Sequence, residues 1–259
     1  DSDQIKKGIV TASTGNHGAA VSLAMKMLDV NGKIIVPKNI AHNKLLNIKR
    51  LGGIVEFYGK DCIESEFRAK EISKEIGSTY ISPYNDPEII TGQGTIGIEL
   101  DNQLNNIDEV FVSVGGGGLI SGIGGYLNQV QPEAKIVACS PINSCVMYES
   151  LNAGRILDLP SKQTLSDGTA GGVEEGSITY DICKKVIDDF VLVTEREISL
   201  GIKKAINDDH QLIEGSAGTA IAAFIKRKKI LTGKRVVIII CGGNINSATL
   251  KKVISWIVH

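Results

Sequence analysis

The sequence predicts an α/β protein with largely parallel sheets. Short runs rich in β-branched residues alternate along the chain with segments of helical periodicity. Most of these runs are continuously apolar, as is typical of parallel strands that are covered by helices on both faces. Regular alternation of strand and helix also favours crossover connections, which place successive strands in parallel.

Eight segments are expected to form strands, and these are residues 8–13, 33–37, 53–58, 79–82, 109–114, 135–140, 190–194 and 235–241. Between them, residues 62–76 predict an amphipathic helix, because one helical face carries Ile63, Phe67, Ile72 and Ile76. A further helix is expected over 195–207, where Thr194 and Glu197 have the spacing of a capping box.

A turn-rich break, Ser82-Pro-Tyr-Asn-Asp-Pro87, follows the first four strand–helix units. Proline and Asx residues in such a cluster are typical of a connection rather than of a strand or helix. We therefore predict two domains, a smaller α/β domain over residues 1–86 and a larger one over residues 87–259.

Composition excludes several classes of partner. The 259 residues carry a net charge of −1, without the basic excess of a nucleic-acid-binding protein. No apolar run approaches the roughly 20 residues that a membrane-spanning helix needs, so no membrane partner is expected. Five scattered cysteines without a C-x-x-C pair indicate reduced thiols and a cytoplasmic location.

Four consecutive glycines, Gly115–Gly118, stand between a predicted strand and a helix that begins near Leu119. Unpaired main-chain N–H groups at the start of a helix form an anion site of about the size of a phosphate. Without Cβ atoms, phosphate oxygens could approach these amides directly. A glycine-rich turn without a ligand remains the alternative.

Two familiar phosphate sites fit this loop poorly. A P-loop ends in Gly-Lys-Ser/Thr, whereas this loop continues Gly118-Leu119-Ile120. A dinucleotide site needs an acidic residue about 20 residues further on, but the next predicted strand ends at Ser140. The second comparison disfavours a nicotinamide-dependent oxidoreductase.

Two more polar turns follow predicted strands. The stretch Ser13-Thr-Gly-Asn-His17 offers short donors and acceptors at a helix start, which suits a carboxylate, although a simple N-cap turn would explain it too. The last strand ends in Cys241-Gly-Gly-Asn244, where a polar atom would face the ligand crevice of an α/β sheet. A buried cysteine would explain that residue equally well. Together, the three turns indicate one crevice for an anionic ligand.

The chain resembles the fold-type II pyridoxal-phosphate enzymes, and within them the threonine/serine dehydratase and serine racemase group. The resemblance spans essentially the whole chain and rests on the order of six motifs, namely Ser13-Thr-Gly-Asn-His17, Gly92-Gln-Gly-Thr95, Ser113-Val-Gly-Gly-Gly-Gly-Leu119, Asp167-Gly168, Glu214-Gly-Ser-Ala-Gly218 and Cys241-Gly-Gly-Asn244. It implies two open, largely parallel twisted sheets flanked by helices, as in the tryptophan synthase β subunit, with the N-terminal part missing.

The resemblance also implies roles for individual residues. The phosphate of pyridoxal phosphate would be bound by the loop Gly115, Gly116, Gly117, Gly118 and Leu119. Its ring hydroxyl would bond to Asn16, and its pyridine nitrogen would face Cys241. The substrate carboxylate would be bound by Ser13, Thr14, Gly15, Asn16 and His17, and Asp167 and Gly168 would lie beside the substrate.

The implied activity is dehydration and deamination of L-threonine or L-serine to a 2-oxo acid and ammonia. The lysine that binds the cofactor lies, in this family, in an S-x-K-x-R-G type segment before the S-x-G-N-H loop. No such segment occurs here, so we expect this lysine upstream of residue 1. Open alternatives are a racemase, a β-replacement enzyme, or a non-catalytic amino-acid-binding module.

Three further expectations follow from the resemblance. Thr14 keeps the hydroxyl that racemases use as an acid–base, so it is a candidate catalytic residue. Ser140 and Val146 stand where metal-binding relatives have carboxylates, so no divalent metal site is expected. A homodimer or homotetramer is the usual assembly of this family.

Overall fold

The computed structural model describes residues 2–60 and 62–255. The chain divides into two compact units, Asp1–Pro83 and Tyr84–His259, rather than at residues 86 and 87. The reason for the shift is that Tyr84 and Asn85 bond within the second unit. The Tyr84 hydroxyl oxygen accepts the N–H of Glu174 at 2.9 Å, and Asn85 Oδ1 accepts the N–H of Ile178 at 3.0 Å.

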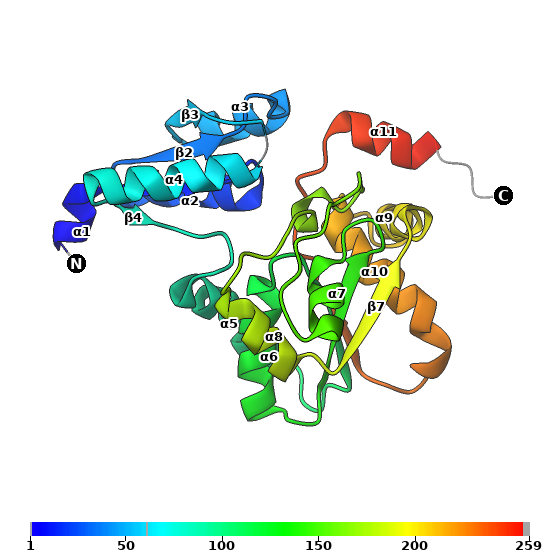
Figure 1. Cartoon of the computed structure of the whole chain (residues 1–259). Coiled ribbons are helices and arrows are strands. Elements are labelled where there is room, and N and C mark those ends of the chain that lie inside the picture. The colour runs from blue at the N-terminus through cyan, green and yellow to red at the C-terminus, as the bar shows by residue number, and fades with distance from the viewer. Residues whose placement is uncertain (1, 61, 256–259) are drawn as a thin grey trace. The chain divides into compact units, whose positions relative to one another are not determined.

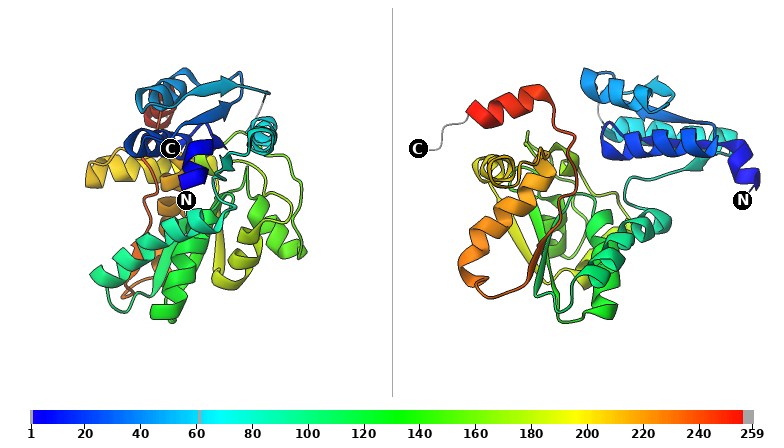
Figure 2. Two further views of the ribbon diagram at one scale, coloured as in Figure 1. Left: turned by 90° about the vertical axis from the view of Figure 1, so that its left-hand side faces the viewer. Right: turned by 180° about the vertical axis from the view of Figure 1, so that it is seen from behind.

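The first unit is built on a four-stranded parallel sheet in the order β3-β2-β1-β4. Its strands are β1 (Ile9–Ala12), β2 (Gly32–Val36), β3 (Val55–Phe57) and β4 (Thr79–Tyr80), and its helices are α1 (Ser2–Lys7), α2 (Asn16–Leu28), α3 (His42–Arg50) and α4 (Cys62–Ile76). One face of the sheet packs against α4 and the other against α2 and α3 (Figures 1 and 2).

The helix α4 has the predicted bounds, but only part of the apolar face identified in the sequence is buried. Ile72 is 5% exposed, whereas Phe67 is 66% exposed. Ile63 and Ile76 are exposed as well. The side of α4 that meets the sheet is formed by Ala69 and Ile72, which pack against β1 and β2, and the other three apolar side chains lie outside that contact.

The second unit is built on another four-stranded parallel sheet, in the order β7-β6-β5-β8. Its strands are β5 (Glu109–Ser113), β6 (Lys135–Pro141), β7 (Asp189–Val193) and β8 (Val236–Ile238). Its helices are α5 (Pro87–Gln103), α6 (Gly118–Val130), α7 (Val146–Ala153), α8 (Ile178–Val186), α9 (Glu195–Asp209), α10 (Gly215–Arg227) and α11 (Ser247–Ser255), with short 3₁₀ turns η1 (Asp167–Thr169) and η2 (Lys228–Ile230). All eight predicted strands are present, and the prediction of two parallel sheets is confirmed.

Helices cover both faces of this second sheet. One face packs against α9 and α10, and the other against α6, α7 and α8, as Figure 2 illustrates. Outside this layer, α5 packs closely on α6, because a Cβ on Gly122 would lie 2.4 Å from the carbonyl oxygen of Ile90 and 2.5 Å from the nitrogen of Gly94. The glycine of the Gly92-Gln-Gly-Thr95 motif at position 94 therefore serves helix packing.

The start of α9 has the predicted capping box. The Thr194 hydroxyl accepts the N–H of Glu197, and the Glu197 carboxylate accepts the N–H of Thr194 at 2.7 Å. Two of the four N–H groups that a helix start leaves without partners are involved in such reciprocal bonds.

Within residues 2–60 and 62–255, none of the helices has the length and apolar character needed to cross a bilayer.

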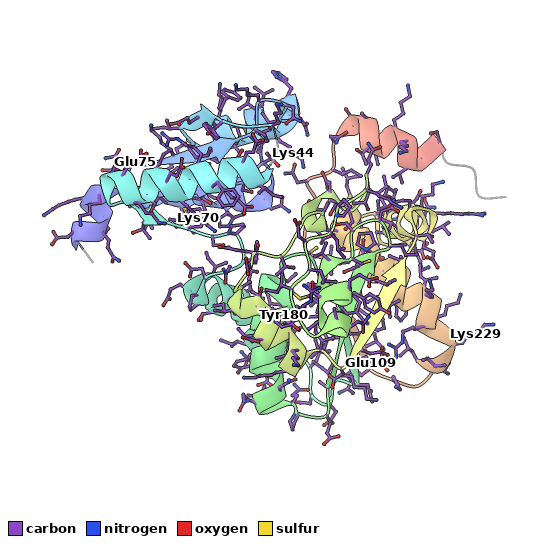
Figure 3. All side chains as sticks on the ribbon, viewed as in Figure 1. Lys44, Lys70, Glu75, Glu109, Tyr180 and Lys229 are labelled. Carbon is purple, nitrogen blue, oxygen red and sulfur yellow. The ribbon has the colours of Figure 1, made fainter. Side chains whose placement is uncertain are left out.

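A buried charge at the amino end of β5 has a structural explanation. The carboxylate of Glu109, labelled in Figure 3, is almost fully buried and lies 2.8 Å from Lys234 Nζ and 3.5 Å from Arg227 Nη2. A buried carboxylate is costly unless cations and hydrogen bonds compensate it. This ion cluster therefore holds the sheet end that lies opposite the glycine loop.

Candidate functional site

Most of the candidate residues of the second unit lie at the carboxyl edge of its sheet. The central strand β5 has β6 on one side and β8 on the other, so the strand order reverses there. Ligands of open α/β sheets bind at such a switch point, outside the carboxyl ends of the strands. The glycine loop follows β5 and the turn that begins with Cys241 follows β8, so the topology brings these two segments to one edge.

The glycine loop leads directly into α6. Gly117 is the N-cap residue, with a φ of 89° and no side chain capping the helix. Within the described part of the chain, the N–H groups of residues 116–119 donate no hydrogen bond to another residue. Thr179 Oγ1 donates to the carbonyl oxygen of Gly116 at 2.6 Å and so fixes the loop from behind. Unpaired amides at a helix start fit an anion.

The direction of each missing Cβ in this loop is occupied by protein. A Cβ on Gly115 would lie 2.7 Å from the carbonyl oxygen of Thr169, and one on Gly116 would lie 2.4 Å from Cγ of Tyr84. At Gly117 the Cβ would lie 2.8 Å from Cys183 Sγ. Close packing behind the loop thus requires bare backbone at these three positions.

The turn after β8 presents Cys241, a half-buried free thiol. Burial, and then the negative charge of Glu214, raise the pKa of this thiol to about 12. The sulfur therefore stays protonated and neutral, and it can act as a weak hydrogen-bond donor.

The Asp167-Gly168 pair lies in η1, beside the glycine loop. Both residues are exposed, and the next residue in η1, Thr169, is the one that borders Gly115. A Cβ on Gly168 would lie 2.7 Å from Ser216 Oγ at the start of α10. The structure therefore brings the glycine loop, η1 and the start of α10 together.

The loop Ser13–His17 belongs to the first unit and follows β1. Its helix α2 begins at Asn16, with Gly15 as an N-cap residue that gives no side-chain cap. Ser13 Oγ accepts the N–H of Gly15 at 3.2 Å, and Thr14 is half-buried. A Cβ on Gly18 would lie 2.4 Å from the Ser13 carbonyl oxygen, so Gly18 lets the helix pack tightly under the loop.

His17 is held by the interior of the first unit. Its Nε2 lies 3.0 Å from Oγ1 of the buried Thr11, and this hydroxyl donates to the carbonyl oxygen of Ile81 at 2.6 Å. The imidazole therefore ties α2 to β1 and to the segment after β4, and this tether fixes the start of α2.

The two positions considered for a metal have structural roles. Ser140 Oγ donates to the carbonyl oxygen of Val114 at 2.8 Å, and Val146 is buried in the core. Among the described residues there is no group of three or more His, Cys, Asp or Glu side chains that could hold a metal ion.

Two residues beside the site were missed by the sequence reasoning. Tyr84 packs against Gly116 and Gly118, and Glu214 contacts the turn that follows β8. Tyr84 sat in a stretch interpreted only as a domain break, and Glu214 in a motif to which no role was given. The available signal was weak: a glutamate directly before a glycine-rich helix start, within one of the six ordered motifs.

Comparisons of this chain with known proteins agree on one protein family. A family model described as pyridoxal-phosphate dependent enzyme matches residues 2–242. The chain is 37% identical to threonine dehydratase 2 biosynthetic, chloroplastic, from Solanum lycopersicum, over 97% of this chain and 42% of that protein. The solved processed form of threonine deaminase isoform 2 from the same plant superposes with a TM-score of 0.92 at 36% identity, covering 98% of this chain and 74% of that one. Maize serine racemase superposes with a TM-score of 0.89 at 32% identity, covering 98% and 78%.

Proposed function

The chain belongs to the family of pyridoxal-phosphate dependent enzymes, and we propose that it acts as a dehydratase that converts L-threonine or L-serine into a 2-oxo acid and ammonia. The observation that carries this proposal is the glycine loop, whose unpaired amides at the switch point suit the cofactor phosphate. The substrate class is supported by the threonine dehydratase relative, of which the chain spans 42%. The activity therefore stays a proposal about the whole protein.

The resemblance to this family implies which residues would hold the cofactor. The amides of residues 116–119 would bind its phosphate, Cys241 would meet its pyridine nitrogen, and Asn16 its ring hydroxyl. When bound, pyridoxal phosphate stabilises negative charge on the substrate α-carbon. A neutral thiol beside the ring nitrogen would not keep that nitrogen protonated, which favours rapid elimination over a long-lived carbanion.

The substrate would be held by its carboxylate at the start of α2. That helix presents its positive end there without a side-chain cap, which favours an anion. Ser13, Thr14 and Gly15 supply the surrounding hydroxyls and backbone, and His17 holds the helix start in place. Asp167 and Gly168 would border the substrate from η1.

Three finer statements belong to the same proposal. The lysine that binds the cofactor would lie in a segment that precedes Asp1, the assembly would be a homodimer or homotetramer, and the location would be the cytoplasm. An intact denatured mass of 27.6 kDa, the mass of these 259 residues, would contradict the first statement. Sedimentation of the native protein tests the second, and microscopy of a tagged protein in its own cells tests the third.

The deciding experiment is incubation of the full-length protein and pyridoxal phosphate with L-threonine. We expect 2-oxobutanoate and ammonia in equal amounts, and pyruvate from L-serine. If neither amino acid yields a 2-oxo acid, the dehydratase assignment is wrong. Binding of these amino acids without turnover would instead identify a non-catalytic module.

Racemisation is the second candidate, because maize serine racemase superposes closely and Thr14 carries a hydroxyl. Chiral analysis of unreacted serine separates the two activities. We expect Thr14→Ala to abolish any D-serine formation while dehydration continues, and Thr14→Ser to retain both. Formation of D-serine by Thr14→Ala would remove Thr14 from the acid–base role.

A further inference from the structure

Glu214 is a buried carboxylate that does not serve the helix it precedes. It is the N-cap residue of α10, yet its side chain makes no capping hydrogen bond to that helix. The residue is only 5% exposed. Removing a carboxylate from water carries a large free-energy cost unless hydrogen bonds compensate it. The contacts of Glu214 therefore indicate what this carboxylate is for.

Both the side chain and the main chain of Glu214 hold the turn that follows β8. Glu214 Oε2 accepts the N–H of Asn244 at 3.0 Å, and the Glu214 N–H donates to the carbonyl oxygen of Gly242 at 3.1 Å. A Cβ on Gly243 would lie 3.0 Å from the carbonyl oxygen of Leu212, so the turn packs closely on this segment. Cys241 is the first residue of the turn held in this way.

The same carboxylate also borders η1. A Cβ on Gly168 would lie 3.4 Å from Glu214 Oε1, and 2.7 Å from the neighbouring Ser216 Oγ. The side chain of Glu214 thus stands between the Asp167-Gly168 pair and the turn that begins at Cys241. One residue is in contact with two of the segments that surround the proposed cofactor.

We propose that Glu214 is a positioning residue, whose carboxylate fixes the turn of residues 241–244 and so sets the place and charge of the Cys241 sulfur for the cofactor. This inference rests on the proposed function, since that function gives Cys241 its partner. The geometry has an electrostatic consequence, because burial and the charge of Glu214 both raise the pKa of the Cys241 thiol. Among the described residues, the thiol of Cys139 also interacts electrostatically with Cys241, and burial raises the pKa of that thiol.

Two variants separate the hydrogen bond that holds the turn from the negative charge of the carboxylate, and Ser216→Ala is their matched control. Glu214→Ala removes the acceptor of the Asn244 N–H, whereas Glu214→Gln keeps an acceptor oxygen and removes only the charge. Ser216 is on the same helix turn, and its buried hydroxyl has no hydrogen-bond partner among the described residues. Its removal should leave the turn unchanged.

The readouts require neither substrate nor cofactor, so they remain interpretable if the proposed activity fails. In the full-length protein we expect hydrogen exchange at the Asn244 amide to accelerate about ten-fold in Glu214→Ala and to stay near wild type in Ser216→Ala. We expect the pH profile of Cys241 alkylation, followed by peptide mass spectrometry, to move to lower pH in Glu214→Gln, because more thiolate forms at a given pH.

Unchanged Asn244 exchange in a folded Glu214→Ala protein, or an unchanged Cys241 profile in Glu214→Gln, would overturn the proposal. If Glu214→Ala does not fold, the hydrogen bond to the Asn244 N–H is tested instead with Glu214→Asp, whose shorter side chain should also accelerate exchange at Asn244. The exchange and alkylation shifts can be observed whether or not the protein forms a 2-oxo acid. They therefore test this inference separately from the dehydratase assignment.

Discussion

The ring of Tyr84 lies directly behind Gly116, where a Cβ would stand 2.4 Å from Cγ of the tyrosine. The same residue borders Gly118, whose Cβ would lie 3.0 Å from Cα of Tyr84. The tyrosine is itself held at its hydroxyl by the N–H of Glu174. Tyr84 therefore packs against the glycine loop and supports it at these two positions.

The first prediction concerns this contact. Gly116→Ala should lower the free energy of unfolding by about 1–3 kcal/mol, because the added methyl group overlaps the tyrosine ring and the loop is fixed by Thr179. Urea unfolding of the full-length protein measures the loss, and fluorescence titration with pyridoxal phosphate should show weaker binding.

The control for that substitution is Gly125→Ala, on α6, the helix that follows the glycine loop. No atom lies within 4 Å of the Cβ position of Gly125. Alanine is a better helix former than glycine by about 1 kcal/mol, so this variant should be neutral or stabilised. Equal losses in the two variants would show that Tyr84 does not restrict position 116.

The second prediction concerns the proposed partner of the pyridine nitrogen. Cys241→Ser keeps a neutral hydroxyl donor and should bind pyridoxal phosphate nearly as well as wild type. Cys241→Ala removes the donor, and the loss of about 1 kcal/mol expected for one hydrogen bond corresponds to roughly five-fold weaker binding. Equal affinities of the serine and alanine variants, measured by titration, would remove Cys241 from this role.

The third prediction concerns the pH dependence of the α9 capping box. Burial raises the pKa of Glu197, but hydrogen bonds from the N–H and hydroxyl of Thr194 and the nearby Lys226 outweigh it, so the pKa lies below its ordinary value of 4.5. A lowered folded-state pKa gives stability that is present above pH 4.5 and lost as the pH falls through the folded value.

Thr194→Ala should cost about 1 kcal/mol at pH 7, the typical effect of an N-cap. The stability difference between wild type and Glu197→Gln should shrink as the pH is lowered below 4.5. Denaturant unfolding measures both effects. It should cover roughly pH 3 to pH 7, the range over which protonation of Glu197 changes the stability. A difference that grows on acidification would contradict the lowered pKa.

The strands were predictable from sequence because parallel strands are buried on both faces. In β5, all five residues from Glu109 to Ser113 are buried, and the apolar run from Val110 to Val112 at its centre marks the strand without help from tertiary structure. The capping box at Thr194 was predictable for a related reason, since its partners lie within one helical turn.

Contacts between distant segments could not be predicted in this way. Glu214 meets Asn244 across the end of the sheet, and Tyr84 meets Gly116 through the packing of a linker. Neither contact leaves a periodic pattern in the sequence. Hydrophobic periodicity also shows only that a helix has an apolar side, and in α4 the sheet buries Ala69 and Ile72 while Phe67 stays exposed.

The fourth prediction tests that arrangement of α4. Ile72 is 5% exposed and packs with Val10, Ala12 and Ile35, so Ile72→Ala should lower the free energy of unfolding by about 2–5 kcal/mol through lost burial and a cavity. Phe67 is 66% exposed, so Phe67→Ser should change it by no more than about 0.5 kcal/mol. Urea unfolding of the full-length protein compares the two. A loss for Phe67→Ser as large as that for Ile72→Ala would mean that this face of α4 is covered in the folded protein, since only a buried ring can lose that much free energy.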